Sequence, residues 1–437
     1  MNPDHQSDDR PPSPALCPEP GQSSDPNNPR LIAFFLTQYH PIPENDEWWG
    51  KGFTEWTNVT KAKSLFKGHY QPHLPADLGF YDLRMRETRH EQVKLAKQYG
   101  IDGFCYYYYW FSGRRILHRP LEDMLADKDH DMPFCLCWAN ENWSRRWDAA
   151  EHEVLLAQKY MPEDSLEFIK SLDPYLRDPR YILKDGKPLI IVYRPQHLPD
   201  ARETAAVWRQ YCQEVGIGEI HICAALTHGN LDHQQFGFDS GVEFPPHNLE
   251  SIWIQQQISF YEEFSGLVCQ YKDLAELYLA REYEGSVYRG VFPSWDNTAR
   301  RAHRSLIILN GTPANYEYWL ASTIDRVKND PLSRDFVFIN AWNEWAEGCH
   351  LEPDRRWGRS FLESTRDVKK GMRRYHAFQD TVTPIKYVQP TPSFRADVYR
   401  VLRTHFRRKL HGTLPLRLRK SRFSRKLKAL LLSGHSQ

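Results

Sequence analysis

The sequence predicts an α/β fold, a (β/α)₈ barrel of the TIM type with long loops at the carboxyl ends of its strands. Three observations lead to this prediction. The chain has 437 residues, which is enough for one large domain. Short apolar segments alternate with amphipathic helical patterns, as is typical of a parallel sheet covered by helices. Polar and aromatic motifs follow seven of the eight apolar segments, and a barrel would bring all of them to one mouth.

The predicted strands are short apolar runs. Apolar residues at successive positions are expected where helices cover both faces of a parallel sheet. The candidates span residues 31–37, 102–109, 133–138, 189–194, 220–226, 240–244, 288–293 and 336–342.

Helical patterns separate most of these runs. Gly100 directly follows the first helical pattern, where a helix C-cap is expected. Asp164 and Asp200 stand at expected N-cap positions. A doubly wound open sheet is the competing fold, but the Gly-rich phosphate loop that usually follows its first strand is absent from the sequence. The clearest helical patterns cover residues 83–99, 164–177, 200–215, 271–284 and 313–328.

Composition divides the chain into three predicted parts. Residues 1–30 form a leader rich in Pro, Ser and Asp, which we expect to be disordered. Residues 31–380 form the catalytic barrel, and residues 381–437 form a basic extension. Residues 395–437 contain thirteen Lys and Arg and one acid, Asp397. This tail is either a solvated extension or a peripheral attachment to an anionic membrane.

Charge and cysteine content narrow the class of protein. The formal net charge of +1 argues against a whole-protein grip on nucleic acid, so no nucleic-acid partner is expected. The eight cysteines have no metal-type spacing. The sequence shows neither a signal peptide nor an apolar run of the roughly 18–20 residues that a transmembrane helix needs. We therefore expect a cytoplasmic protein with reduced thiols, peripheral to the membrane if the tail attaches.

The strongest chemical motif ends the last predicted strand. It reads Ala-Trp-Asn-Glu-Trp-Ala-Glu-Gly and contains Asn343, Glu344, Trp345 and Glu347. Glycosyl transfer needs two carboxyl groups, one protonated to assist the leaving oxygen and one ionised as base or nucleophile. Two carboxylates three residues apart, between indoles, suit that chemistry. The structural alternative is a solvated acidic turn.

A second motif follows the third predicted strand and reads WANENWSRRW. Amide and carboxyl groups between indoles suit recognition of sugar hydroxyls, and the arginines suit an anionic group such as a uronate or phosphate. Ordinary tryptophan packing with surface arginines is the alternative. The candidate binding residues in this motif are Trp138, Asn140, Glu141, Trp143 and Arg145.

Further candidates stand at the other strand ends. The loop after the first strand is long and aromatic, and we interpret it as a wall over the mouth; the alternative is an aromatic cluster packed on the outside of the barrel. Each remaining residue is a weak candidate alone. The set comprises Tyr39, His40, Trp49, Trp56, Tyr109, Tyr193, Glu243, His247, Trp295 and Asp296.

Signals for metals and nucleotides are poor. The aspartates of residues 127–131 superficially suit a divalent cation, but they precede a strand and would lie on the face opposite the mouth, so we interpret them as a solvated turn. No P-loop or dinucleotide fingerprint is present in the sequence. We expect no metal and no cofactor.

Several long segments resemble the WbsX-type family of bacterial polysaccharide and O-antigen lipopolysaccharide gene clusters, whose members are usually labelled glycosyltransferases. The resemblance covers about residues 31–375. The chain departs from the pattern at Thr37, where Pro is expected, and in its basic extension. The segments are HPIPENDEWWGKGFTEWTNV, HYQPHLPADLGFYDLR, YGIDGFCYYYYWF, PFCLCWANENWSRRWD, PSWDNTARR and FINAWNEWAEGCHLEPD.

This family is in turn similar to glycoside hydrolase family 99, endo-acting α-mannosidases built on (β/α)₈ barrels. The similarity is confined to an Asn-Glu-Trp-x-Glu-Gly core, here Asn343 to Gly348. It implies that Glu344 acts as base on the substrate's own 2-hydroxyl, giving a 1,2-anhydro sugar and retention, and that Glu347 is the general acid/base. It does not imply specificity for mannose.

Three functions remain open from the sequence. The residues favour a retaining glycoside hydrolase or a transglycosylase of surface-polysaccharide metabolism. The family label favours a glycosyltransferase that uses a sugar nucleotide in O-antigen or polysaccharide biosynthesis. A non-catalytic glycan-binding protein is the third. In each case the expected partner is an oligo- or polysaccharide, and the family's gene context suggests that it is lipid-linked.

Overall fold

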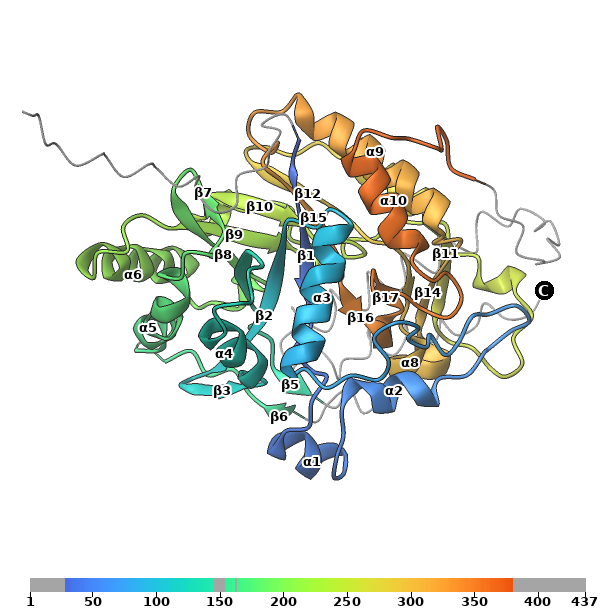
Figure 1. Ribbon diagram of the computed structural model, residues 1–437, viewed down its shortest axis with the longest axis horizontal. Helices are drawn as coiled ribbons and strands as arrows, with labels where there is room; N and C mark the ends of the chain where they lie inside the picture. The colour runs from blue at the N-terminus through green and yellow to red at the C-terminus, as the bar shows by residue number, and fades with distance from the viewer. Residues whose placement is uncertain (1–27, 145–153, 162, 380–437) are drawn as a thin grey trace, which may run out of the picture. The chain divides into compact units, whose positions relative to one another are not determined.

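The computed structural model describes residues 28–144, 154–161 and 163–379. Eight parallel strands pair in the order β1-β15-β12-β10-β9-β8-β4-β2, and β2 pairs with β1 to close the sheet. The open-sheet alternative is therefore excluded, and the predicted (β/α)₈ barrel is confirmed (Figure 1). The barrel strands are β1 (Arg30–Phe35), β2 (Gly103–Phe111), β4 (Phe134–Trp138), β8 (Lys187–Val192), β9 (His221–Leu226), β10 (Ser240–Glu243), β12 (Val287–Val291) and β15 (Phe336–Ile339).

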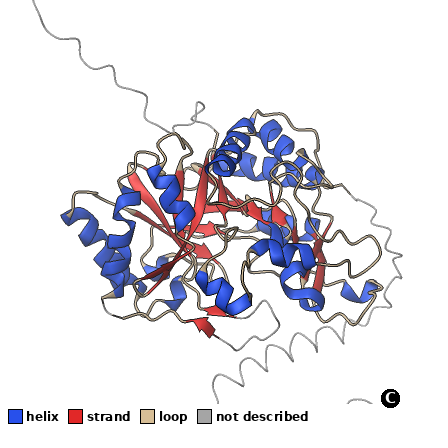
Figure 2. Cartoon of the chain, turned by 60° about the horizontal axis from the view of Figure 1, so that its bottom comes forward, coloured by secondary structure: helices blue, strands red, loops and turns tan. Residues whose placement is uncertain are grey.

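Helices surround the strands on the outside of the barrel (Figure 2). Between β9 and β10 the described chain has only the short 3₁₀ helix η3 (Gln234–Phe236), so the strand–helix alternation is broken there. The principal helices are α3 (Arg86–Gln98), α4 (Arg119–Ala126), α5 (Asp164–Leu176), α6 (Ala201–Glu214), α7 (Tyr271–Ala280), α9 (Pro313–Lys328) and α10 (Ser360–Lys369).

The five predicted helices all exist, with ends shifted by a few residues. Asp200 caps α6, because its carboxylate accepts the backbone N–H of Glu203 at 2.9 Å. The cap predicted at Asp164 is wrong by one residue. Glu163 holds the N-cap of α5, and Asp164 instead accepts the backbone N–H of Met161 at 2.9 Å.

The barrel interior is filled with side chains rather than open. Phe34 of β1 contacts Tyr107 of β2, Phe244 and Phe338, with ring centroids 4.5–5.9 Å apart. The seven cysteines in the described part of the chain are buried and free of disulfide bonds. Together these contacts make a packed core on which the loops at the strand ends are mounted.

Short helices and strands occupy the loops that follow the barrel strands, except β7, which lies in the loop before β8. They matter because they carry the polar motifs found in the sequence. They are α1 (Pro43–Trp49), α2 (Glu55–Lys61), β3 (Arg114–Ile116), β5 (Trp143–Ser144), β6 (Val154–Leu156), β7 (Leu183–Lys184), η2 (Pro195–His197), η4 (Gln255–Gln257), β11 (Leu267–Gln270), β13 (Trp295–Asp296), α8 (Thr298–Arg301), η5 (Ala302–Arg304), β14 (Leu306–Leu309), β16 (Asn343–Glu344), η6 (Trp345–Glu347) and β17 (Cys349–His350).

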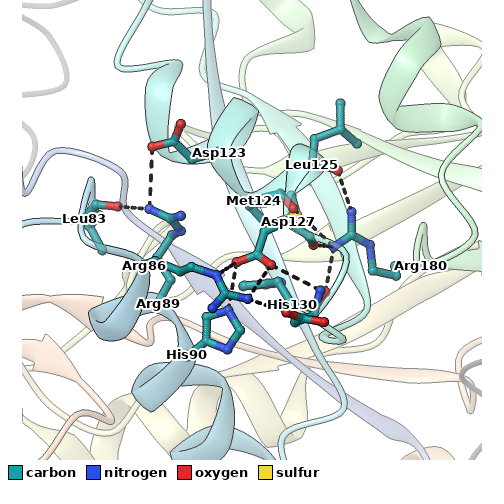
Figure 3. Close-up of polar contacts among 11 residues, drawn as sticks. Leu83, Arg86, Arg89, His90, Asp123, Met124, Leu125, Asp127, His130 and Arg180 are labelled. Atoms are coloured by element: carbon teal, nitrogen blue, oxygen red, sulfur yellow. Dashed lines mark hydrogen bonds and ion pairs between the residues drawn. The ribbon is translucent and has the colours of Figure 1, made fainter.

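The acidic segment before β4 takes part in a polar network with α3 (Figure 3). The predicted solvated turn fits Asp129 and Asp131, whose side chains are 81% and 68% exposed. It is wrong for Asp127, which is largely buried because it pairs with Arg86 at 2.9 Å and His90 at 2.8 Å.

Arg180 completes this network by covering the carboxyl end of α4 (Figure 3). Its guanidinium donates to the carbonyls of Met124, Leu125, Asp127 and His130 at 2.6–3.2 Å. The last carbonyls of a helix have no partner within the helix, and a cation there also complements the helix dipole. Arg180 thus fixes the turn that leads into β4.

We predict that Arg180→Ala lowers the free energy of unfolding by about 2–3 kcal/mol, because it leaves these carbonyls without donors. Denaturant-induced unfolding measures the loss. Arg84→Ala is the matched control: Arg84 is half-exposed and its described contacts are with Asp82, at 2.7 Å, and such pairs contribute only about 0.2–1 kcal/mol. Equal losses in the two variants would contradict the capping role.

Candidate functional site

A cavity of about 630 Å³ lies among the loops that follow the barrel strands. Its described lining comes from the end of β2 and from residues after β1, β4, β8, β9, β10, β12 and β15, so the strand-end motifs do converge. The predicted site residues that line it are Tyr109, Glu141, Trp143, Tyr193, His247, Trp295, Glu344 and Glu347.

The two glutamates stand on a tight hairpin that follows β15. Strands β16 and β17 pair antiparallel, with Glu344 opposite Cys349, and Glu347 ends the 3₁₀ turn between them. Gly348 closes the turn with φ +57°, and a Cβ there would lie 2.9 Å from the carbonyl oxygen of Asp296. A glycine is therefore required for both conformation and space.

Hydrogen bonds from the first strand's end hold this hairpin in place. The amide of Asn343 accepts from the backbone N–H of Leu36 at 2.7 Å and donates to its carbonyl at 3.0 Å. The Tyr39 hydroxyl donates to the carbonyl of Asn343 at 2.8 Å. On the far side, the Trp345 indole donates to Glu352 at 2.7 Å. Asn343, Tyr39 and Trp345 thus position the glutamates without lining the cavity.

One guanidinium group joins three carboxylates at the cavity wall. Arg300 Nη2 lies 3.0 Å from both Glu55 Oε2 and Glu344 Oε2, and Arg300 Nη1 lies 2.6 Å from Glu347 Oε1. Glu55 is fully buried, Glu344 is nearly so, and the Glu347 side chain is 21% exposed. Three acids face one base, so the cluster has an excess of negative charge when all three are ionised.

That excess changes the acidity of the pair. The pKa of Glu344 is raised to about 8, chiefly by burial and also by the neighbouring Glu347 and Glu55, against the opposing effect of Arg300. Burial also raises the pKa of Glu347 above its usual value. Since like charges this close resist joint ionisation, the pair holds a proton at neutral pH.

Aromatic side chains form the walls around these carboxylates. The Tyr109 hydroxyl accepts from Gln38 at 3.0 Å, and the Tyr193 hydroxyl bonds to His247 Nε2 at 2.9 Å. The Trp143 ring packs on Tyr109 with centroids 5.3 Å apart. The indole of Trp295 also lines the cavity, and its N–H is buried without an acceptor among the described residues. Flat apolar faces beside polar groups suit a sugar ring.

Several predicted binding residues lie outside the described lining. Trp138 stacks on Phe168 in the core with centroids 4.1 Å apart. Asn140 exchanges two hydrogen bonds with the backbone of Arg194 at 2.7 and 2.8 Å, which ties the end of β4 to the end of β8. Buried Glu243 pairs with Arg289 at 3.0 Å inside the barrel. These contacts are structural.

The same holds for the candidates on the loop after β1. The Trp56 indole donates to the carbonyl of Tyr81 at 2.8 Å, and Trp49 stacks on Phe53. His40 is buried away from the lining. Asp296 lies behind the wall and pairs with His69 Nε2 at 2.5 Å. Arg145 lies outside the described residues.

The sequence predictions missed Glu55 and Arg300, together with the cavity-lining residues Arg301, Arg304 and His228. Glu55 and Arg300 do occur in the motifs FTEWTNV and PSWDNTARR. Their partnership had no signal in the sequence because 245 residues separate them.

Among the described residues that line the cavity, no group of three convergent metal ligands occurs; the one such group in the described chain, His73, His350 and Asp354, lies outside the lining.

Fold and site define a class: a (β/α)₈ barrel with buried, paired carboxyl groups in an aromatic cavity at its mouth. The family model described as Glycosyltransferase WbsX matches residues 31–365, and the chain belongs to this family. The uncharacterized protein WxcX of Xanthomonas campestris pv. campestris, from two strains, is 48% identical over 344 residues, covering 77% of this chain. The chain spans about half the length of these relatives, 49%.

Solved structures share the fold at low identity. A glycoside hydrolase-like protein aligns with a TM-score of 0.50 and 12% identity, covering 81% of this chain and 97% of that one. The family 99 endo-α-mannosidase of Bacteroides thetaiotaomicron aligns with a TM-score of 0.47 and 13% identity, covering 78% and 97%. At such identities the first of these matches supports the fold alone.

We predict that Arg300→Gln lowers the free energy of unfolding by about 3–5 kcal/mol at pH 8, because three buried carboxyl groups lose their cation. The folded-state pKa values of Glu344 and Glu347, already raised, rise further when the cation is removed. A raised carboxyl pKa favours the folded state at low pH, and that contribution is lost as pH rises through the folded value. The loss at pH 5 is therefore smaller.

Denaturant unfolding at the two pH values measures this difference. Arg114→Gln is the control, because Arg114 is exposed and pairs with Glu44 at 2.7 Å, away from the three glutamates. A loss in Arg300→Gln that is independent of pH would contradict the electrostatic explanation.

Proposed function

We propose that the chain cleaves or transfers glycosidic bonds, with Glu344 and Glu347 as the catalytic pair. The observation that carries this proposal is the contact of both carboxylates with the single guanidinium of Arg300 at the wall of the cavity. Two carboxyl groups held this close to each other can act on one sugar from the same side. One proton shared by the pair supplies an acid and a base together.

The proposed reaction is retaining. Glu344 accepts the proton of the sugar 2-hydroxyl as O2 attacks C1, and Glu347 donates its proton to the departing glycosidic oxygen. The product is a 1,2-anhydro sugar. Water, or the hydroxyl of an acceptor, then gives its proton to Glu347 and opens the ring at C1, while Glu344 returns the proton to O2. Two inversions at C1 give net retention.

Before substrate binds, the raised pKa values favour the proton on Glu344, whereas the scheme above requires it on Glu347. The raised pKa of Glu344, about 8, places the proton on Glu344 at neutral pH before substrate binds. Glu347 is the more exposed member, so it is the more accessible to a leaving group. Substrate binding must therefore move the pair's proton towards Glu347.

The substrate class that we propose is an oligo- or polysaccharide. The aromatic walls formed by Tyr109, Trp143, Tyr193 and Trp295 support it. A lipid-linked glycan and a membrane contact through residues 381–437 remain predictions, because that segment lies outside the described residues. No helix in the described chain is long and apolar enough to cross a membrane.

A sugar-nucleotide-dependent glycosyltransferase is the second candidate. The observation that favours it is a pair of arginines, Arg301 and Arg304, on the cavity wall. Arg304 is half-buried and has no carboxylate partner among the described residues. Guanidinium groups bind phosphate well, so a diphosphate could lie there. The family description, Glycosyltransferase WbsX, supports the same reading.

We predict that Glu344→Gln and Glu347→Gln each lower turnover of the producer's own polysaccharide by at least ~10²-fold, while the fold is retained. Mass spectrometry of the products measures turnover, and circular dichroism checks the fold. Azide should rescue Glu347→Ala and yield a glycosyl azide of retained configuration, because azide needs no general base. It should not rescue Glu344→Ala. Near-wild-type activity in both Gln variants would exclude the pair.

We predict that UDP-, GDP- and TDP-sugars give no saturable thermal stabilisation if the enzyme is a hydrolase or transglycosylase. A specific shift with one nucleotide sugar that disappears in Arg304→Ala would instead establish the transferase. Arg202→Ala, at an exposed site on α6 where Arg202 bonds to backbone carbonyls, is the control and should leave any shift unchanged.

A further inference from the structure

Three buried side chains gather outside the cavity, behind the hairpin that carries the glutamates. His73 Nδ1 lies 3.0 Å from His350 Nε2, and His350 Nε2 lies 3.9 Å from Asp354 Oδ2. One ligand atom from each lies within 4.8 Å of the other two. All three residues are at most 7% exposed. Two imidazole nitrogens and a carboxylate oxygen form a donor set typical of Zn²⁺.

Backbone groups orient His350 and Asp354 so that a lone pair of each side chain points at the other members of this cluster. His350 Nδ1 bonds to the carbonyl of Glu352 at 2.9 Å, which places the ring proton on Nδ1 and the lone pair on Nε2. Asp354 Oδ1 accepts the backbone N–H groups of Arg356 and Trp357 at 2.9 and 2.6 Å, so Oδ2 is left to face the histidines. Metal-bound histidines are commonly oriented by such a bond to a carbonyl.

Hydrogen bonding alone does not satisfy the group. A proton between His73 and His350 accounts for their two facing nitrogens. Asp354 Oδ2 then has no hydrogen-bond donor, although its residue is 2% exposed. The phenol oxygen of the neighbouring Tyr70 lies beside the Asp354 carboxylate without reaching ordinary hydrogen-bond geometry. A buried, unsatisfied carboxylate oxygen is costly, and a cation among the three ligand atoms removes the cost.

We propose that His73 Nδ1, His350 Nε2 and Asp354 Oδ2 bind one divalent ion of the Zn²⁺ class, with a water molecule or the Tyr70 phenol in the fourth position. Tetrahedral ligands at about 2.0–2.1 Å from zinc lie about 3.3 Å from one another, so small side-chain shifts from the present separations suffice. No metal site was expected from the sequence, and the proposed zinc site differs from that expectation. It stands independently of the proposed function.

The ion has a structural role. His350 belongs to β17, opposite Asn343 of β16, and its ring stacks on Trp345 at 3.8 Å. His73 comes from the segment between α2 and α3, far away in sequence. An ion shared by His73 and His350 therefore fixes the glutamate hairpin to that segment. It lies behind the carboxylates and takes no part in the reaction.

The test uses the full-length protein, stripped with a chelator and titrated with Zn²⁺ alone by calorimetry, with metal content measured by mass spectrometry. We expect one ion per chain and a higher melting temperature in its presence. Asp354→Asn and His73→Gln should each weaken binding at least tenfold. His90→Gln is the control, since His90 pairs with Asp127 elsewhere (Figure 3) and should bind Zn²⁺ as the wild type does.

Binding of Co²⁺ can be measured in the wild-type protein, so this test does not depend on whether a variant folds. In the stripped wild-type protein it should show the intense visible absorption of a tetrahedral site, and added Zn²⁺ should abolish that absorption. Absence of saturable Zn²⁺ binding by the wild type would overturn the proposal. So would stoichiometric binding that persists at full affinity in both Asp354→Asn and His73→Gln, because other residues would then hold the ion.

Discussion

The ion-pair cluster around Arg300 is the interaction on which the rest of the site depends. Taking a carboxylate out of water is costly, and three of them share one guanidinium here. A single cation cannot neutralise all three. Burial, together with this remaining negative charge, raises the pKa of Glu344 to about 8, so a proton relieves the excess charge. Stability of the mouth and chemistry of the pair thus follow from the same imbalance of charge.

The order of strands in the barrel makes this cluster possible. Glu55 stands on the loop after β1, Arg300 on the loop after β12, and the glutamate pair on the loop after β15. These three strands are consecutive in the sheet, in the order β1-β15-β12. Parallel strands deliver their following loops to the same end of a barrel, so residues more than 240 positions apart meet. The hairpin of Glu344 and Glu347 lies in the middle of the three.

The sequence predicted the fold well because the barrel depends on local patterns. Short stretches of consecutive residues are enough to predict apolar strands and amphipathic helices, and all eight strands occur where expected. The site was predicted in part. Whether an aromatic or polar residue at a strand end faces the cavity or the core depends on its rotamer and on neighbours that are distant in sequence. Trp138 packs on Phe168 and Asn140 bonds to the backbone of Arg194, so neither lines the cavity. Arg300 was missed because its partners are distant in sequence.

The charge of the cavity bears on hydrolysis and transfer alike. The positive charges of Arg300 and Arg194 are compensated within the protein, the first by the glutamate cluster and the second by Glu141. Arg304 has no such carboxylate among the described residues, yet it is half-buried on the same wall. A partly desolvated guanidinium favours an anionic group, either the acidic sugar of a polysaccharide or the diphosphate of a nucleotide donor. An anionic group on the proposed glycan or donor would compensate the charge of Arg304, which a neutral glycan would not do.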